Sequence, residues 1–394
     1  MSIKLICFEP WKGLGITEYD SGFGDRIKYW VLAYQLSLII EGIQIIVEEK
    51  YWPELLLLDL PNTTTQNITW KSYKNKLIPI GWEEVKNIMI TRVNSLLNFS
   101  NDVCYYFDFS LEDMANIFED QNVTNNFIIH QGVSKIKLKL PAVSDFIQKQ
   151  FSDSYYIHLR RGRGTFPTAK FLNEMEQCLT KEFVLDYWRM FHTIKLGSNT
   201  RSKIYKYYDS LIEKDTYIDE KYSPTERHRS LAKMVGNSDE EILKDYKWVN
   251  SYKIVPDSDY FNLILNYIFK KNPNQKIYIS SDIPKKYYSH YYDNFSGNII
   301  DKDYYFKIFL DLYTDKISKK DLEKEYSTPI LKVFENVFDL MVGCFSNNIV
   351  RSTSNWSKIS SLYKKKKVIL YGGETSINSL ENWIFMDGEI DFID

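Results

Sequence analysis

Residues 27–47 read IKYWVLAYQLSLIIEGIQIIV, and their pattern of apolar residues indicates the fold class. Apolar residues recur at helical spacing over Ile27–Glu41, and a short continuous apolar run follows at Ile43–Val47. Another apolar run, Ile3–Phe8, precedes them. A helix between two short buried strands is a βαβ unit, in which the strands are parallel. The chain is therefore predicted to open as an α/β protein.

The alternation of strands and helices continues along the chain, with a second unit that starts at Tyr155–Leu159. Residues 165–250 are instead charged, Tyr-rich and helical in character, which predicts an insertion, and residues 373–394 are predicted to be a tail. Further strands are expected at Leu77–Ile80, Val103–Phe107, Phe127–His130, Tyr252–Pro256, Lys276–Ser280, Val342–Phe345 and Val368–Tyr371, and further helices at Phe171–Trp188, Asp239–Trp248, Tyr260–Phe269 and Pro329–Met341.

The composition excludes several classes of protein. The 394 residues include 50 Lys and Arg against 52 Asp and Glu, so the net charge is −2 and no general basic excess exists for nucleic acid. Aromatic residues make up 16% of the chain, which fits core packing and also a sugar- or base-stacking surface. The chain contains no run of 18 apolar residues, so no membrane span is predicted, and its first residues do not form a signal peptide. We therefore expect a cytoplasmic protein whose four cysteines are buried thiols.

A glycine-bearing segment, GFGDR (22–26), is expected between the first strand and the first helix. Glycine lets a backbone approach a ligand closely, and a helix N-terminus favours anions. The spacing matches neither a dinucleotide fingerprint nor a loop that ends in Gly-Lys-Ser/Thr. A ligand-facing turn and an ordinary turn capped by Asp25 both fit this segment.

The stretch YYIHLRRGRG (155–164) joins a predicted strand to a loop with three arginines and two glycines. One Arg side chain can bind two phosphate oxygens at once and remains charged, so Arg160 and Arg161 suit a diphosphate, with His158 beside them. Such a pair neutralises a leaving diphosphate without a metal. The alternatives are a solvated basic loop, an internal ion-pair cluster and a nucleic-acid-binding patch, which the balanced charge disfavours.

Two other predicted segment ends carry polar side chains. The strand that includes YISS (278–281) is followed by Asp282, and ligands bind outside the carboxyl ends of parallel strands. A carboxylate there accepts two hydrogen bonds from a guanine edge, whereas the alternative is a helix N-cap. The segment RSTSNWS (351–357) opens a helix with hydroxyl and amide groups, which suit phosphate oxygens or ordinary helix capping.

Taken in order, GFGDR, HLRRGRG, YISSD and TSNWS resemble the motifs of the fucosyltransferase superfamily of inverting enzymes that use a GDP-sugar. That group includes the α1,2-, core α1,6- and protein O-fucosyltransferases and the rhizobial chitin-oligosaccharide enzyme. The resemblance implies an α/β fold of the GT-B type, in which two Rossmann-like domains face a cleft. The acceptor-side domain would span 1–150 and the GDP-sugar-binding domain 151–372, with the helical insertion at about 165–250. Residues 48–125 and the insertion match nothing in the family pattern.

The resemblance also implies roles for particular residues. Arg160 and Arg161 would hold the GDP diphosphate near His158, and Asp282 would read guanine. Many members carry Asp where this chain has Arg163, which leaves the subfamily open and removes one carboxylate from the site. Phosphate would be contacted by Thr353, Ser354, Asn355 and Ser357. The glycines Gly22 and Gly24 would let the donor approach the N-terminal domain closely.

The implied function is an inverting transfer of L-fucose from GDP-fucose to a hydroxyl of a glycan acceptor. An inverting transfer needs a base at the attacking hydroxyl, and Glu174, Glu176 and Asp25 are the candidates, with Arg160 as the catalytic cation. No DxD motif stands at a donor position, so we expect no metal and no cofactor. The alternatives are a transferase for another nucleotide-activated deoxyhexose, a non-catalytic glycan- or nucleotide-binding protein on the same fold, and an RNA-binding protein.

Overall fold

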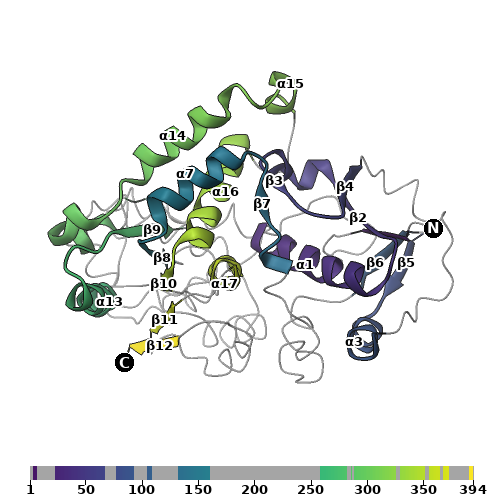
Figure 1. Cartoon of the computed structure of the whole chain (residues 1–394), viewed down its shortest axis with the longest axis horizontal. Coiled ribbons are helices and arrows are strands. Elements are labelled where there is room, and N and C mark those ends of the chain that lie inside the picture. The colour runs from purple at the N-terminus through teal and green to yellow at the C-terminus, as the bar shows by residue number, and fades with distance from the viewer. Residues whose placement is uncertain are drawn as a thin grey trace, which may run out of the picture.

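The computed structural model confirms the predicted opening βαβ unit (Figure 1). Strand β1 (Ile3–Ile6) pairs with β2 (Ile43–Glu48) in parallel, and α1 (Phe23–Ile39) connects them. The structure describes residues 3–6, 23–66, 77–92, 104–108, 132–159, 258–281, 285, 288–324, 329–350, 355–363, 367–371 and 390–393.

The N-terminal half is built on a five-stranded parallel sheet of order β4-β2-β1-β6-β5. The predicted strands at Leu77–Ile80 (β5) and Val103–Phe107 (β6, Cys104–Phe107) are confirmed, whereas the edge strand β4 (Thr63–Gln66) was not predicted because it is polar. Chain order runs from β1 outward to β2 and β4 on one side and then returns to β5 and β6 on the other. The order of the strands therefore reverses between β1 and β6, although all five strands are parallel.

Helix α1 begins earlier and is more deeply buried than its periodicity predicted. It starts at Phe23, so Gly24, Asp25 and Arg26 belong to its first turn and not to a preceding loop. Residues on nearly all sides of the helix are buried, and Leu38 near its C-terminal end is the large exposed exception. The helix contacts β2, α3 (Trp82–Thr91) and α17 (Asn355–Leu362) of the C-terminal half. These contacts on several sides explain why apolar residues are not confined to one face of the helix.

The C-terminal half contains a second five-stranded parallel sheet, of order β12-β11-β10-β8-β9. The predictions of β8 (Tyr155–Leu159), β9 and β11 are confirmed. The segment 373–394, expected as a tail, contains β12, which pairs with β11. The remaining bounds are β9 Ile277–Ser281, β10 Asn348–Val350, β11 Lys367–Tyr371 and β12 Ile390–Ile393.

The strand predicted at Val342–Phe345 is wrong. Helix α16 (Ile330–Phe345) continues through these residues, and the strand is the shorter β10 that follows. All four residues are buried, so their apolar run is continuous and its periodicity does not separate a helix from a strand.

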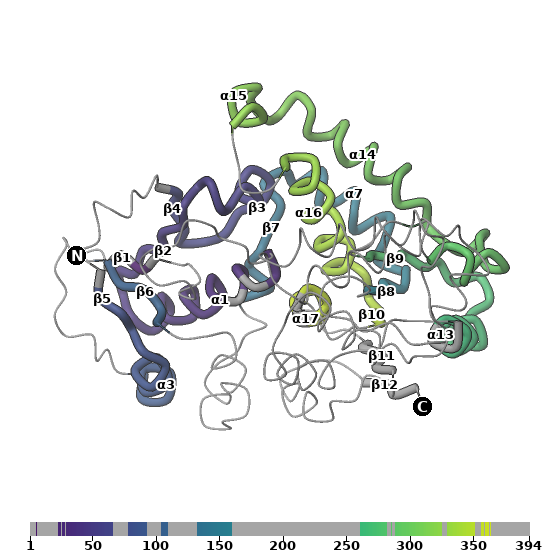
Figure 2. Tube along the Cα trace, turned by 180° about the vertical axis from the view of Figure 1, so that it is seen from behind, coloured from purple at the N-terminus to yellow at the C-terminus, as the bar shows by residue number. Residues whose placement is uncertain are grey.

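Helices cover both faces of this sheet. Figures 1 and 2 show α13 (Ser258–Lys271) and α16 on opposite sides of the strands. Helix α7 (Pro141–Phe151) packs on α16, and the Phe151 ring meets the rings of Tyr278 and Phe338 at centroid distances of 5.4 and 5.9 Å. Residues just before position 151 thus pack on the C-terminal half, while the division into two domains stays a prediction.

The two halves touch through several elements and share one contiguous cluster of buried apolar residues, which runs from Leu5 to Ile359. Lys324, beyond α15, pairs with Glu49 at 2.7 Å between Nζ and Oε1. Tyr313 of α14 donates from its hydroxyl to the Leu57 carbonyl at 3.5 Å. The remaining elements are α14 (Lys302–Thr314), α15 (Lys319–Leu322), the 3-10 helices η2 (Glu49–Tyr51), η3 (Pro53–Leu56) and η5 (Ser289–Asn298), and the antiparallel pair β3 (Leu58–Asp59) and β7 (Lys137–Leu138).

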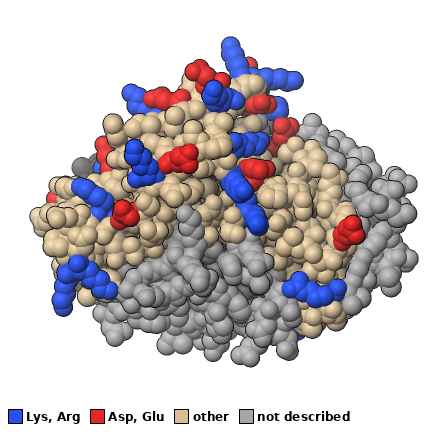
Figure 3. Space-filling model, viewed as in Figure 1, with Lys and Arg blue, Asp and Glu red and all other residues tan. Residues whose placement is uncertain are grey.

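Two of the four cysteines, Cys104 and Cys344, lie in the described residues. Both are buried free thiols, as expected. Within the described residues, no helix is long and apolar enough to cross a bilayer. Figure 3 shows Lys and Arg interspersed with Asp and Glu on the face it presents, in line with the balanced charge. Four predicted elements lie outside the described residues: Phe127–His130, Phe171–Trp188, Asp239–Trp248 and Tyr252–Pro256.

Candidate functional site

Three of the four sequence motifs leave the same edge of the C-terminal sheet. Strand β8 pairs in parallel with β9, so that His158 lies opposite Ser280. On its other side β8 pairs in parallel with β10, where Ile157 lies opposite Val350. Each motif therefore begins where one of three neighbouring strands ends, because parallel strands have their carboxyl ends at one edge.

The order of these strands makes that edge a topological switch point. The chain passes from β8 to β9 on one side, and then crosses to β10 on the other side of β8 and continues outward to β11 and β12. In open parallel sheets, ligands bind in the crevice outside the carboxyl ends where the order reverses. That crevice lies between β8 and β10, which lead into the HLRRGRG and RSTSNWS motifs.

Most of the predicted site residues lie outside the described residues, so their placement stays a prediction. Gly24 is in the buried first turn of α1, and His158 on β8 is 5% exposed. Ser357 in α17 (Asn355–Leu362) has no exposed surface. Asp25 and Asn355 belong to helices whose course is described, but their side chains are not. The residues outside the described ranges are Gly22, Arg160, Arg161, Glu174, Glu176, Asp282, Thr353 and Ser354.

The starts of α1 and α17 meet, which brings the first and fourth motifs together. Phe23, the first residue of α1, packs edge-on against Trp356, the second residue of α17, with ring centroids 5.9 Å apart. Helix α1 follows the switch strand β1 of its sheet, and α17 follows β10 of the other sheet. The crevice ends of the two sheets are therefore in contact through these two helices.

A buried ion pair fixes the first turn of α1. The Arg26 guanidinium donates to Glu54 Oε1 at 2.6 Å and lies 5.7 and 5.6 Å from the ring centroids of Phe23 and Trp52. Arg26 is 4% exposed and Glu54 1%. Burial raises the pKa of the Glu54 carboxyl, and the charge of Arg26 opposes that rise. The turn that carries Gly24 and Asp25 is therefore held by charge-assisted and aromatic contacts.

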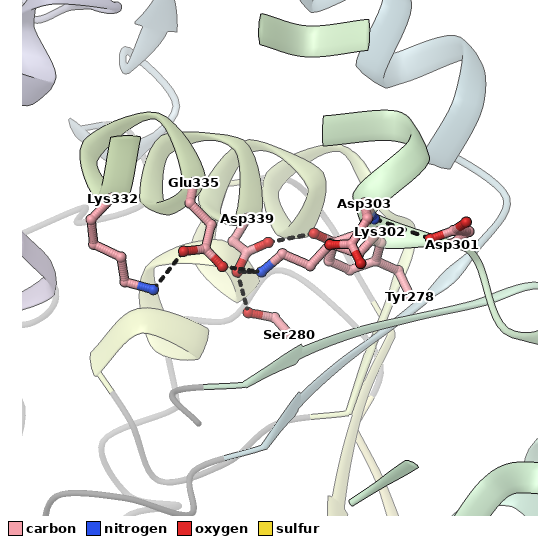
Figure 4. A network of polar contacts seen from close by, with 8 residues as sticks. All are labelled: Tyr278, Ser280, Asp301, Lys302, Asp303, Lys332, Glu335 and Asp339. Carbon is pink, nitrogen blue, oxygen red and sulfur yellow. Dashed lines mark hydrogen bonds and ion pairs between the residues drawn. The ribbon is translucent and has the colours of Figure 1, made fainter. Parts of the chain in front are cut away.

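A second polar network lies beneath the carboxyl edge, and no sequence motif pointed to it (Figure 4). Asp339 on α16 accepts hydrogen bonds from the hydroxyls of Tyr278 and Ser280 on β9. Its Oδ2 also lies 2.8 Å from Lys302 Nζ, at the start of α14. The one available signal was an acid inside the apolar run of α16, where a charge needs partners.

Glu335, one turn before Asp339, extends this network to the surface. Its two carboxylate oxygens pair with Lys302 Nζ at 2.8 Å and with Lys332 Nζ at 2.7 Å. Burial would raise the pKa of Glu335, but the two lysines lower it overall. Burial would lower the pKa of Lys302, but Asp339 and Glu335 raise it to about 12. The network ties α14 and α16 to the strand that leads to Asp282.

The described residues contain no group of three or more His, Cys, Asp or Glu side chains that could hold a metal ion.

No family model matches the chain, and none of the curated proteins does. Among solved structures, the crystal structure of fucosyltransferase NodZ from Bradyrhizobium matches at 9% identity and a TM-score of 0.33, covering 91% of this chain and 93% of that chain. NodZ alpha-1,6-fucosyltransferase soaked with GDP-fucose matches at 9% identity and a TM-score of 0.34, covering 92% and 93%. These scores do not establish a common fold, so the proposal below depends on the strands and motifs of this chain.

Proposed function

We propose that this protein is an inverting glycosyltransferase of the GT-B type that transfers L-fucose from GDP-fucose to a hydroxyl of a glycan acceptor. The observation that carries this proposal is the strand order around β8. The strands that lead into HLRRGRG, YISSD and RSTSNWS are neighbours in one parallel sheet. A nucleotide diphosphate is the ligand class that arginines, a carboxylate and a hydroxyl-rich helix start suit together at such an edge.

In this proposal each motif contacts a different part of the donor. Arg160 and Arg161 bind the diphosphate, with His158 beside them, and Asp282 accepts hydrogen bonds from the guanine edge. Gly22 and Gly24 let the donor approach the N-terminal half. The phosphate oxygens are also contacted by Thr353 and Ser354, which precede α17, and by Asn355, its first residue.

The chemistry is a single displacement at C1 of the sugar. The acceptor oxygen forms a bond to C1 as the bond from C1 to the diphosphate oxygen breaks, and the acceptor proton passes to a carboxylate. Glu174, Glu176 and Asp25 are the candidates for this base. The positive charge of Arg160 stabilises the departing diphosphate, a role that a divalent metal fills in other transferases, so we expect transfer without added metal.

A thermal-shift panel of GDP, GDP-fucose, UDP, UDP-glucose and ADP, each with and without EDTA, tests the donor. A ligand that binds only the folded chain raises the unfolding midpoint. We expect a rise with GDP and GDP-fucose alone that EDTA does not change. A rise with UDP compounds instead would overturn the fucosyl assignment, and no rise with any nucleotide would favour a non-catalytic glycan-binding protein.

A variant pair then tests the site. Arg160→Ala is expected to abolish the GDP shift, whereas Lys149→Ala, which removes an exposed charge from α7, is expected to keep it. Circular dichroism checks that both variants are folded. Release of GDP from GDP-fucose, coupled to labelling of a glycan, separates a transferase from a silent binding protein. Equal GDP shifts in the two variants would contradict the assignment of Arg160.

A further inference from the structure

A cavity of about 390 Å³ opens along the outer edge of β9, a size in the range of small-molecule sites. Strand β9 is the last strand of its sheet, and β8 lies on its other side. The chain returns along the free edge, where Ile299 bridges to Ile277 and the Ile300 amide donates to the Ile277 carbonyl at 2.8 Å. The cavity is therefore enclosed between β9, η5 and the starts of α14 and α16.

Three isoleucines and two tyrosines give the cavity an apolar wall. Ile279 comes from β9, and Ile299 and Ile300 come from the returning segment. The rings of Tyr288 and Tyr292 are 6% and 4% exposed and lie 6.2 Å apart, so their position is fixed by packing. A wall of this kind suits the C–H groups of a ligand.

Apart from Ser281, the rest of the lining is charged and carries both signs. The ammonium of Lys285 and the carboxylate of Asp303 are exposed, and neither has a hydrogen-bond or ion-pair partner among the described residues. Lys332 is paired with Glu335. Lys302 is held by Glu335 and by Asp339 behind it (Figure 4). Three lysines and two carboxylates therefore line the cavity, and Asp339 behind Lys302 supplies a third carboxylate.

Such a lining selects the chemistry of the ligand. An anion would meet Asp303 and Glu335, and a cation would meet the lysines, so a net charge of either sign is disfavoured. A hydroxyl group both donates and accepts, and therefore pairs with an ammonium and with a carboxylate. We propose that this cavity binds a neutral sugar unit, whose hydroxyls reach Lys285 and Asp303 and whose C–H groups lie against the isoleucines.

The cavity is distinct from the proposed diphosphate crevice, although Ser281 in its lining directly precedes Asp282, the proposed guanine contact. None of the described residues that line it comes from β8, β10 or α17. The crevice lies between β8 and β10, and adjacent strands are about 4.8 Å apart, so the outer edge of β9 is roughly 10 Å away. The inference goes beyond the proposed transfer and does not depend on the identity of the donor.

Saturation-transfer NMR titrations test the proposal with methyl glycosides of glucose, galactose, fucose and N-acetylglucosamine. Glucose 6-phosphate and glucosamine serve as anionic and cationic probes. We expect at least one neutral glycoside to bind more tightly than either charged probe. Lys285→Ala and Asp303→Ala are each expected to raise its Kd by about tenfold, the value of one hydrogen bond. Both residues are exposed, so the fold is expected to survive.

Matched controls come from α14, where Lys307→Ala and Asp311→Ala remove exposed charges away from the cavity and should leave Kd unchanged. Binding of no glycoside, tighter binding of a charged probe, or equal Kd values in all four variants would overturn the proposal. Displacement of the glycoside by GDP-fucose would also overturn it, because the glycoside would then occupy the donor site. A chain that binds the glycoside but no nucleotide would contradict the proposed function and leave this site standing.

Discussion

Asp339 is the residue on which the described polar network depends. Its carboxylate accepts from two hydroxyls of β9 and pairs with Lys302, so three polar groups would lose a partner without it. Tyr278 is fully buried, and burial followed by the nearby Asp339 charge raises the pKa of its hydroxyl well above the usual value. Tyr278 therefore stays a neutral donor, and the end of β9 is held in one position.

Replacing Asp339 by Ala is expected to lower the free energy of unfolding by on the order of 3 kcal/mol, because it leaves a partly buried ammonium and two hydroxyls without this acceptor. Asp339→Asn keeps one acceptor oxygen and is expected to lower the free energy of unfolding by a smaller amount. Urea unfolding followed by circular dichroism measures both. A loss below about 0.5 kcal/mol for Asp339→Ala, typical of a surface change, would show that the network does not stabilise the fold.

The ion pairs of Glu335 are expected to make the stability of the protein depend on pH. The folded pKa of Glu335 lies below the ordinary value of 4.5, so its ion pairs contribute fully above that pH. The contribution is lost as the pH falls through the folded pKa. The stability difference between the wild type and Glu335→Gln should therefore shrink between about pH 6 and about pH 3. Lys302 keeps its charge throughout, with a pKa of about 12. A difference that is constant over this interval would contradict the prediction.

At the scale of elements, Gly343 sets how closely α16 approaches its neighbours. A Cβ at this position would lie 2.6 Å from Ser360 Oγ, 2.9 Å from Ser360 Cβ and 3.0 Å from the Tyr156 ring. Ser360 and Tyr156 are both fully buried, so neither has free space to move into. The absence of a side chain at Gly343 is what lets α17 and β8 pack directly on α16.

Gly343→Ala is therefore expected to destabilise the chain by about 1–3 kcal/mol, since overpacking outweighs the gain in helix propensity. Gly297→Ala is the matched control, because nothing lies within 4 Å of its Cβ position. If the slope of the unfolding free energy against urea is the same in both variants, the shift of the urea midpoint gives the difference in stability. If the Gly343 variant proved as stable as the Gly297 variant, the close approach of the two helices would not be a constraint.

The alternation of apolar runs predicted most described strands, because short buried strands between helices leave a clear pattern. The prediction failed where that pattern is absent: β4 is polar, β12 has acidic neighbours, and α16 is too apolar for its end to be recognised. The candidate site was predictable only as separate motifs. Which strands are neighbours depends on the crossover from β9 to β10, and no local signal in the chain specifies its direction.

At the scale of the whole molecule, the apolar core is continuous between the two halves. The contact of Phe23 with Trp356, the pairing of Lys324 with Glu49 and the packing of η3 on α16 all cross from one half to the other. Of these, the Lys324–Glu49 pair is partly exposed and contributes little, because ion pairs near the surface are weak. The apolar contacts, among them the buried Phe23 ring against the partly buried Trp356 ring, are the principal connection.

A shared core predicts that both halves unfold in one cooperative calorimetric transition. Phe23→Ala should lower the midpoint, since removing a buried Phe costs about 3–5 kcal/mol. Leu38→Ala, on the same helix but 55% exposed, should leave it nearly unchanged. Scanning calorimetry that resolved separate transitions for the two halves of the wild type would contradict a common core.

The position of β8 has a consequence for how the chain is made. Its sheet partners are encoded far downstream, since β9 begins at Ile277 and β10 at Asn348. A ribosome adds about 5–20 residues per second, so β8 leaves it on the order of 10 s before its first partner. The N-terminal sheet, by contrast, is complete once Phe107 has emerged. For that interval the nascent chain carries an apolar strand with both edges open to other chains, and the yield of soluble protein depends on what shields that strand during translation.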